Sequence, residues 1–418
     1  MAETTRHVER VEQDLDLVQS CGITRLRYPV RWHRIEKSPG EFDWAATDRV
    51  LGRIRDRGLV PILDLVHHTS YPKWLTEGFG DARFPDAYLR YAEAVARRYE
   101  WIEEYTLFNE PFSTLFLSGH EAIWPPYRQG LESFLTLVGN VLPAVAEASR
   151  LYAKLLPDAR HVYVDSCEGH TSAGPAGDEL ATLANDRRFF VADLFLGKDL
   201  DRDRPFVAKV VDAGFEDLLS MPPGRIDVLG LDYYAHCQWE FTASDAGVVP
   251  SPKPAALRDQ IVEYWDRYQL PCMLGETNIR GFGSDQATWL KYTLEQCEQA
   301  RDAGVTFDGY CWFPFIDSAD WDSLLYRCDG SIDPVGVYSL DCNLDRVPTA
   351  MTESFRLAAA GTPASALPAF ELQEPVATWL QGFGPEMAHW RWQPPPPGQV
   401  GPTVDRPDER IELRVVDR

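Results

Sequence analysis

Short apolar runs alternate with helical patterns along most of this chain, and that alternation limits the folds open to it. Residues 59–66 (LVPILDLV) form a nearly continuous apolar run, which is typical of a strand buried on both faces of a parallel sheet. Segments with apolar residues at helical spacing, such as 7–20 and 86–100, lie between the strand-like runs. Strands that alternate with helices in this way predict repeated βαβ units.

The pattern predicts an α/β fold of the (β/α)8 TIM-barrel type that is one strand short. The predicted strands are 23–30, 59–66, 102–108, 161–165, 225–234, 272–276 and 307–313. The chain begins with the helix 7–20, where a barrel would begin with a strand. Three explanations stay open: the first strand is absent from the N-terminus, the barrel is incomplete, or residues 411–416 (IELRVV) supply the strand.

A change of composition near residue 362 predicts the domain organisation. We expect residues 1–361 to form the barrel and residues 362–418 to form a Pro-rich C-terminal extension, which includes the four prolines at 394–397. Within the barrel, residues 131–155 predict a long helix that is interrupted near Pro143.

Charge and composition exclude several classes of partner. The net charge of −23 argues against nucleic acid and anionic membranes, and no apolar run is long enough to predict a transmembrane helix. The polar N-terminus predicts no signal peptide, and the eight scattered cysteines suit reduced thiols. We therefore expect a cytoplasmic protein. No His/Cys set has metal-ligand spacing, so neither a metal nor a cofactor is expected.

Two glutamates follow predicted strands and indicate the chemistry. Glu110 ends the stretch 102–110, and Glu276 ends the strand 272–276. Because the carboxyl ends of barrel strands meet at one rim, the two carboxyl groups can face one substrate. Glycoside hydrolysis needs such a pair, separated by ~5 Å for retention of configuration and by ~6.5–9.5 Å for inversion. The carbohydrate substrate is the partner that this pair predicts.

The sequence around Glu110 resembles glycoside hydrolase family 1, the β-glucosidase and β-galactosidase family of the large clan of retaining (β/α)8 barrels. Residues 106–111 (TLFNEP) match the family's Thr-x-Phe-Asn-Glu-Pro motif. The resemblance implies that Glu110 is the general acid/base and that Asn109 binds the 2-hydroxyl of the sugar. Residues 26–35 (LRYPVRWHRI) resemble the family strand in which Arg27 would pair with the nucleophile.

Further segments extend the resemblance over about residues 8–345. Residues 227–234 (DVLGLDYY) resemble the family's Gly-x-Asn-Tyr-Tyr strand, which implies that Tyr234 hydrogen-bonds the nucleophile Glu276. The segment 65–75 resembles a family segment whose histidine binds sugar hydroxyls, and both His67 and His68 fit that role. The remaining implied sugar-binding residues are Trp312, Asp320 and Trp321.

Four departures from the family pattern accompany these matches. The nucleophile motif reads Gly-Glu-Thr-Asn instead of Thr-Glu-Asn-Gly, and the first strand is missing. Asp232 stands where the family has Asn, and Asp320 stands where it has Glu. We expect a retaining β-glycosidase that acts on small glycosides or oligosaccharides by double displacement. The alternatives are an endo-glycanase of another family in the clan and a non-catalytic carbohydrate-binding protein on a decayed barrel.

Overall fold

The computed structural model describes residues 2–198, 200–242, 248–251, 254–321 and 330–371. Two compact units divide the chain. The first consists of residues 25–168 and 178–231 and is called the Glu110 unit here. The second consists of the described parts of 1–24, 169–177 and 232–418 and is called the Glu276 unit.

Parallel strands form the centre of the Glu110 unit. They are hydrogen-bonded in the order β1 (Arg25–Pro29), β4 (Val60–Asp64), β5 (Glu104–Thr106), β6 (Arg160–Ser166) and β8 (Val228–Asp232, whose last residue falls in the other unit). The pairs β1 with β4, β4 with β5 and β5 with β6 are parallel. The order of the strands follows the sequence, as the predicted βαβ units require.

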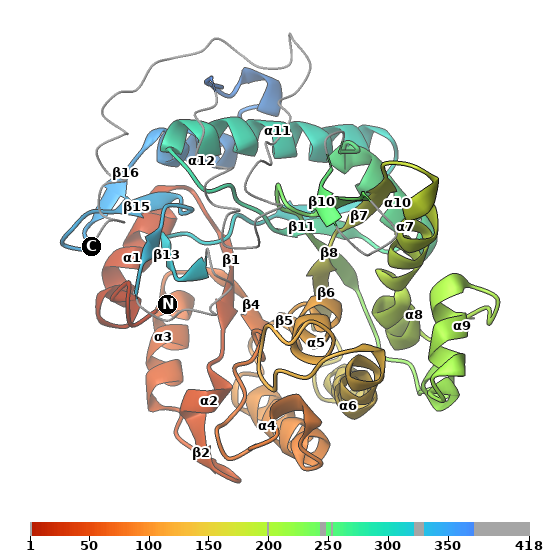
Figure 1. Ribbon diagram of the computed structural model, residues 1–418. Coiled ribbons are helices and arrows are strands. Elements are labelled where there is room, and N and C mark those ends of the chain that lie inside the picture. The colour runs from red at the N-terminus through yellow and green to blue at the C-terminus, as the bar shows by residue number, and fades with distance from the viewer. Residues whose placement is uncertain (1, 199, 243–247, 252–253, 322–329, 372–418) are drawn as a thin grey trace. The chain divides into compact units, whose positions relative to one another are not determined.

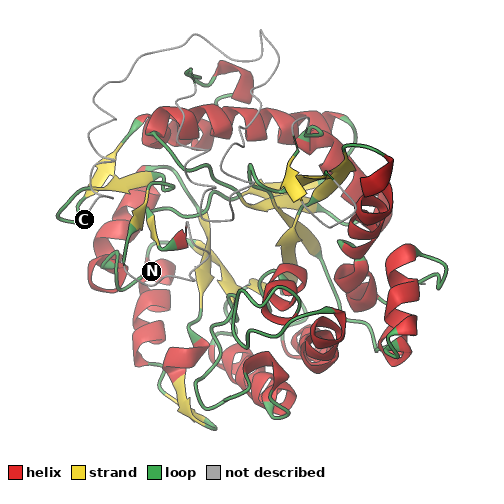
Figure 2. Cartoon of the chain, in the orientation of Figure 1, coloured by secondary structure: helices red, strands yellow, loops and turns green. Residues whose placement is uncertain are grey.

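The Glu110 unit also contains helices, some of which cover the outer face of these strands (Figure 1). They are α2 (Trp32–Ile35), α3 (Ala45–Asp56), α4 (Phe84–Arg98), α5 (Pro111–Gly119), α6 (Leu131–Leu155), most of α7 (Pro175–Arg187), α8 (Phe190–Leu196) and α9 (Pro205–Asp212). Strands β1, β4 and β5 lie on the inner side of α3, α4 and α6 (Figures 1 and 2). On α4, the Tyr88 and Tyr91 hydroxyls donate to the carbonyls of Leu107 and Leu65, which fixes the helix against the chain just beyond β4 and β5.

The interruption expected near Pro143 is absent, because α6 runs without a break from Leu131 to Leu155 with the proline inside it. Its apolar face is buried against α4 and α5, and this packing holds the helix together although Pro143 lacks a backbone N–H. By length and composition alone α6 could cross a membrane. More than half of its apolar window is buried inside the protein, as in the core helix of a globular domain.

The described part of the Glu276 unit contains the last two predicted barrel strands and, besides the N-terminal helix, three further α-helices. Strand β11 (Cys272–Glu276) pairs with β12 (Phe307–Tyr310), and the helices are α10 (Leu257–Tyr268), α11 (Gly283–Asp302) and α12 (Ala350–Ala359). Helix α11 lies beside α12 (Figure 1). Small sheets that the sequence did not predict complete this unit: β7 (Gly169–Ser172) with β9 (Gln238–Phe241) and β10 (Val248–Pro250), β13 (Ser318–Ala319) with β14 (Ile332–Asp333), and β15 (Tyr338–Leu340) with β16 (Arg346–Pro348).

The chain enters this unit through a helix, as expected. Residues 2–6 form turns, and α1 (His7–Ser20) follows directly. A buried ion pair between Asp14 and Arg346 joins α1 to β16. Of the seven predicted barrel strands, all of which are among the described residues, five belong to the Glu110 unit and two to the Glu276 unit. Residues 411–416, the candidate for an eighth strand, lie outside the described residues.

The first part of the predicted C-terminal extension packs on α11. The Lys291 ammonium group donates to the carbonyls of Ser365 and Leu367, each at 2.9 Å. Thr288 and Phe370 exchange two hydrogen bonds, at 2.8 and 3.1 Å. Residues 362–371 are therefore tied to the Glu276 unit, and the rest of the extension lies outside the described residues.

Candidate active site

Glu110 stands at the junction between β5 and α5. Strand β5 ends at Thr106, and residues 107–109 lead from it to Glu110. Pro111 then begins the helix with the φ angle that a first helical turn needs. Glu110 itself has φ 43° and ψ 64°, a left-handed conformation that is costly for a residue with a Cβ. Its side chain is only 11% exposed. The backbone therefore turns sharply at the carboxylate that the sequence selected.

His68 lies beside Glu110 in the Glu110 unit. Its Nε2 lies 3.8 Å from Glu110 Oε2, and its Nδ1 lies 3.1 Å from Thr114 Oγ1. Burial, together with the positive charges of His67 and Arg27, holds the pKa of His68 well below its usual value of 6.5. The imidazole is thus neutral at pH 7, and the His68–Glu110 contact is not an ion pair. Trp124 covers this imidazole at a centroid distance of 4.4 Å.

A second cluster joins the middle of β1, the end of β4 and the segment that follows β5. Arg27 donates to Asn109 Oδ1 at 2.6 Å and approaches Asp64 at 3.6 Å. His67 Nδ1 lies 2.7 Å from Asp64 Oδ2. The amide nitrogen of Asn109 is buried and has no hydrogen-bond partner among the described residues. The structure thus brings together Arg27, His67 and Asn109, while the pairing of Arg27 with Glu276 stays a prediction.

Asp64 is the residue that joins this cluster, and the sequence analysis did not select it. Its side chain is 3% exposed, although it is flanked by apolar residues in the run 59–66. A lone carboxylate in such a run is costly unless it is paired. That exception to the apolar pattern is the signal that could have identified Asp64.

Asp165 is a further carboxylate that sequence reasoning missed. It lies on β6, and its Oδ2 accepts the backbone N–H of Phe112 at 2.8 Å, while its Oδ1 accepts that of Ser113 at 3.3 Å. These are orphan donors of the first turn of α5. Burial raises the pKa of Asp165 to about 7, although these hydrogen bonds favour the charged form. Its partners lie 52 and 53 residues away in sequence, so no local pattern marks it.

Glu276 ends β11 in the Glu276 unit. Its side chain accepts a hydrogen bond from the Tyr234 hydroxyl at 2.7 Å, and the residue is 2% exposed. The backbone carbonyl of Glu276 accepts the N–H of Tyr233 at 2.9 Å, so the chain after β8 runs alongside the end of β11. Asp232, the departure from the family's Asn, is fully buried at the end of β8. The backbone contact therefore holds Tyr234 beside the carboxylate of Glu276, the residue that the sequence predicts as the nucleophile.

The other predicted sugar-binding residues lie after β12, and some of their polar groups form hydrogen bonds within the protein. The Trp312 indole donates to the Val335 carbonyl at 2.8 Å. The Asp320 carboxylate accepts the backbone N–H of Gly330 at 3.0 Å and that of Ser331 at 3.1 Å. Trp321 is 5% exposed. The roles of Trp312, Asp320 and Trp321 in sugar binding stay predictions.

Asp317 organises the same segment and was also missed. It accepts the backbone N–H groups of Val335, Gly336 and Leu340, at 3.0, 2.8 and 2.9 Å. Burial, with a smaller contribution from the charge of Asp333, raises its pKa to about 7. The carboxyl group therefore holds two stretches of chain together around Trp312.

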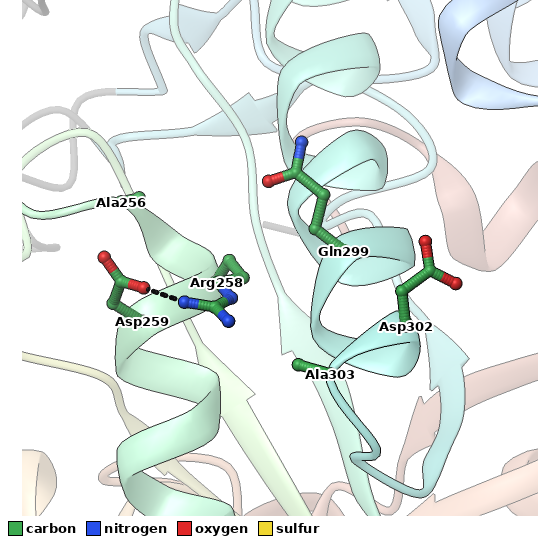
Figure 3. Close-up of a pocket in the computed structure, with 6 residues that line it drawn as sticks. All are labelled: Ala256, Arg258, Asp259, Gln299, Asp302 and Ala303. Atoms are coloured by element: carbon green, nitrogen blue, oxygen red, sulfur yellow. Dashed lines mark hydrogen bonds and ion pairs between the residues drawn. The ribbon is translucent and has the colours of Figure 1, made fainter.

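A surface hollow in the Glu276 unit has no relation to the predicted residues. Figure 3 shows it between the start of α10 and the end of α11, and its lining residues are Ala256, Arg258, Asp259, Gln299, Asp302 and Ala303. Arg258 and Asp259 form an ion pair at 2.6 Å beside it. None of the candidate site residues lines this hollow. Among the described residues, no group of three or more His, Cys, Asp or Glu side chains is placed to hold a metal ion.

Comparisons with known proteins support one family. A β-glucosidase from Agrobacterium sp. is 26% identical over 366 residues, which cover 75% of this chain and 77% of that protein. β-Glucosidase A from Thermotoga maritima is 19% identical over 350 residues, which cover 75% and 78%. The solved structure of the family 1 β-glucosidase from T. maritima superposes with a TM-score of 0.75 at 16% identity, covering 86% of this chain and 88% of that one.

These neighbours confirm the predicted fold class, a (β/α)8 barrel. The family described as glycosyl hydrolase family 1 matches residues 3–246, more than half of the chain. The match includes Arg27, His68, Glu110 and Tyr234, and it ends before Glu276. On this match, and on the arrangement of the residues around Glu110, the protein is a glycoside hydrolase that belongs to glycosyl hydrolase family 1.

Proposed function

We propose that this enzyme hydrolyses β-glycosidic bonds with retention of configuration, with Glu276 as the nucleophile and Glu110 as the general acid and base. The observation that carries the proposal is the hydrogen bond from Tyr234 to Glu276. Tyr234 lies inside the part of the chain that matches the family, whereas Glu276 lies beyond it. The contact therefore links a family residue to a carboxylate that the family match alone does not reach.

The surroundings of Glu276 suit a nucleophile. Its carboxylate is nearly excluded from water, and the Tyr234 hydroxyl holds one oxygen at 2.7 Å. A carboxylate fixed in this way attacks with little loss of conformational freedom. The second oxygen would attack the anomeric carbon and form a covalent glycosyl–enzyme ester.

The surroundings of Glu110 suit a proton donor. A general acid must keep its proton until the leaving oxygen takes it. The nearby His68 ring is neutral and is covered by Trp124, so it adds no positive charge beside the carboxyl group. Glu110 would protonate the leaving oxygen as the glycosidic bond breaks. It would then take a proton from the water that cleaves the ester.

The buried Asn109 amide supports a contact with the sugar. Its oxygen is occupied by Arg27, and its nitrogen is a donor without a partner among the described residues. A sugar hydroxyl would satisfy that donor, and the family resemblance assigns the 2-hydroxyl to it. Contacts to this hydroxyl strengthen in the transition state of glycoside hydrolysis.

Azide rescue distinguishes the roles of the two glutamates. In Glu276→Ala, azide would replace the missing nucleophile and displace the leaving group once, which gives an α-glycosyl azide. In Glu110→Ala, azide would attack the glycosyl–enzyme formed by Glu276, and two displacements give a β-glycosyl azide. Without azide, we expect Glu276→Ala to lose several orders of magnitude in kcat. A Glu276→Ala enzyme with unchanged turnover of an activated aryl β-glycoside would refute the assignment.

We further propose β-glucosides as the substrates to test first. The support is similarity to proteins named β-glucosidase from T. maritima and Agrobacterium sp.. An aryl-phospho-β-D-glucosidase from Bacillus subtilis is also similar, at 22% identity. A phosphorylated substrate is less favoured, because no Lys occurs between Trp312 and Leu340 to bind the phosphate.

A panel of aryl β-glycosides with gluco-, galacto- and fuco-configured sugars, together with a series of oligosaccharides, tests this choice. Turnover of oligosaccharides alone would favour the endo-glycanase alternative. Binding without turnover across the panel would favour the non-catalytic alternative. A cytoplasmic location is likewise a proposal, and fractionation of the native host cells with an antibody against this protein would test it.

A further inference from the structure

The backbone at Glu110 must be held by its surroundings. A residue with a Cβ at φ 43° and ψ 64° is in a conformation that persists only where neighbouring structure enforces it. The Glu110 N–H donates to the Val164 carbonyl at 3.0 Å, and the Glu110 carbonyl accepts the N–H of Thr114 at 2.8 Å. The first of these bonds comes from β6, the strand that carries Asp165.

Asp165, the residue after Val164 on β6, adds further hydrogen bonds to the chain that follows Glu110. Its carboxylate accepts the N–H groups of Phe112 and Ser113, the second and third residues after Glu110. Among the contacts of the described residues, Glu110 does not cap α5 with its own side chain. Asp165 therefore serves as the N-cap of α5 from another strand, with its carboxyl oxygens as the acceptors.

The Asp165 carboxylate is itself held in a fixed orientation. The Ser166 N–H donates to Oδ1 at 3.0 Å, and the Tyr163 hydroxyl donates to Oδ2 at 3.1 Å. A cap that is fixed in this way holds the first turn of α5 in a defined position relative to β6. Glu110 is bonded to Val164 through its own N–H, and the next residues of the chain are bonded to Asp165. A shift of the first turn of α5 would therefore move the Glu110 carboxyl group.

We propose that Asp165 is a positioning residue for proton donation by Glu110, which it controls by fixing the first turn of α5. This inference rests on the proposed role of Glu110 as the general acid. Asp165 does not take part in the chemistry itself. A displacement of the acid by about 1 Å is enough to cost on the order of 100-fold in rate.

The chain offers a matched control in Asp186. Its Oδ2 accepts the N–H of Phe206 at 2.8 Å, the second residue of α9, and that helix also begins with a proline, Pro205. Asp186 is thus also a cap from outside its helix at the second helical residue, and it accepts in addition from the Arg204 guanidinium at 2.7 Å. Helix α9 carries neither of the two glutamates, so loss of this cap affects stability without moving the acid.

The experiment compares kcat/KM for a series of aryl β-glucosides whose phenols range from 2,4-dinitrophenol to phenol. A dinitrophenolate leaves with little help from an acid, whereas a phenolate needs the proton. We expect Asp165→Ala to lower kcat/KM by about 10- to 100-fold for the phenyl glucoside and by less than about 3-fold for the dinitrophenyl glucoside. Asp165→Asn, which keeps one acceptor oxygen, should recover part of the loss.

The outcomes separate the positioning role from its alternatives. Equal losses across the series in Asp165→Ala and Asp165→Asn would overturn the proposal, because a purely structural defect reduces active enzyme for all substrates alike. Asp186→Ala should leave the dependence on the leaving group unchanged. Glu110→Ala should show the steepest dependence, and a flat series for Glu110→Ala would instead refute the proposed function. If Asp165→Ala does not fold, as judged by circular dichroism, Asp165→Asn decides the matter.

Discussion

The ion pair between Asp14 and Arg346 attaches the N-terminal helix α1 to the hairpin of β15 and β16. The Arg346 guanidinium donates to both Asp14 oxygens, at 2.6 and 2.8 Å. The two side chains are 0% and 3% exposed. His7 Nδ1 lies 2.8 Å from the same carboxylate. This bidentate pair is therefore shielded from water and completed by further polar contacts.

Removal of one partner would leave a buried charge without compensation. Asp14→Ala should cost about 3–5 kcal/mol, the range for a broken buried pair. With an unfolding entropy of about 2.1 cal/mol/K per residue, a cooperative unit made of the roughly 350 described residues loses ~0.7 kcal/mol per kelvin. The melting temperature should then fall by about 4–7 °C in differential scanning calorimetry.

Two comparisons test the reasoning. The double variant Asp14→Leu with Arg346→Met removes both charges and should regain most of the lost stability, because apolar replacements of a buried pair are often neutral. Arg10→Ala breaks the pair with Asp345, whose side chain is 58% exposed, and should cost less than about 1 kcal/mol. A melting temperature of Asp14→Ala no lower than that of Arg10→Ala would refute the stabilising role of this buried pair. A double variant whose loss of stability equals the sum of the losses of the two single variants would refute it as well.

Three further outcomes are expected. Tyr234→Phe should lower kcat/KM by about 10- to 100-fold without loss of fold, since it removes a hydrogen bond to the Glu276 carboxylate; an unchanged kcat/KM in steady-state assays would contradict the role of this contact. Because burial raises the pKa of Asp317 from 3.8 to about 7, the folded protein keeps a proton that the unfolded chain has lost, so stability should fall as the pH rises from about 4 to about 7. The fall is at most ~4 kcal/mol, and Asp317→Asn should flatten this part of the melting temperature–pH curve; parallel curves for both proteins would exclude it. Lys291→Met leaves the Ser365 and Leu367 carbonyls without their donor, so limited proteolysis should cut residues 362–371 faster than in the unchanged protein, and equal cleavage rates would argue against the anchor.

The sequence predicted the elements whose signals are local. The helix α1 spans His7–Ser20 and β11 spans Cys272–Glu276, as their apolar spacing and apolar run indicated. Between Pro175 and Leu196 the chain forms two helices, because α7 ends at Arg187 and α8 begins at Phe190. A continuous amphipathic pattern does not reveal such a break, because both helices bury the same kind of face.

The site was predictable where a motif was intact. Glu110 and Asn109 belong to a six-residue motif, and Tyr234 belongs to a strand with a recognisable pattern. Asp165 and Asp317 were missed because their partners are backbone N–H groups, which every residue type except proline presents. The strand β7 was missed for a similar reason: its partner β9 lies about 70 residues further along the chain, and short polar strands have weak local signals.

Glu110 and Glu276 differ in backbone conformation, and this difference determines which substitutions suit an inactive variant at each position. Glu276 lies within an extended strand, a conformation that any residue adopts, so the backbone at this position accepts Gln, Ala or Ser without strain. Glu110 occupies the left-handed region, where Gly and Asn are the residues best tolerated and branched side chains are not. Replacement by Gly there would relieve strain, so an enzyme without its acid could be more stable than the active one. Crystals of trapped complexes are therefore best sought with Gly or Asn at 110, where loss of function and gain of stability coincide.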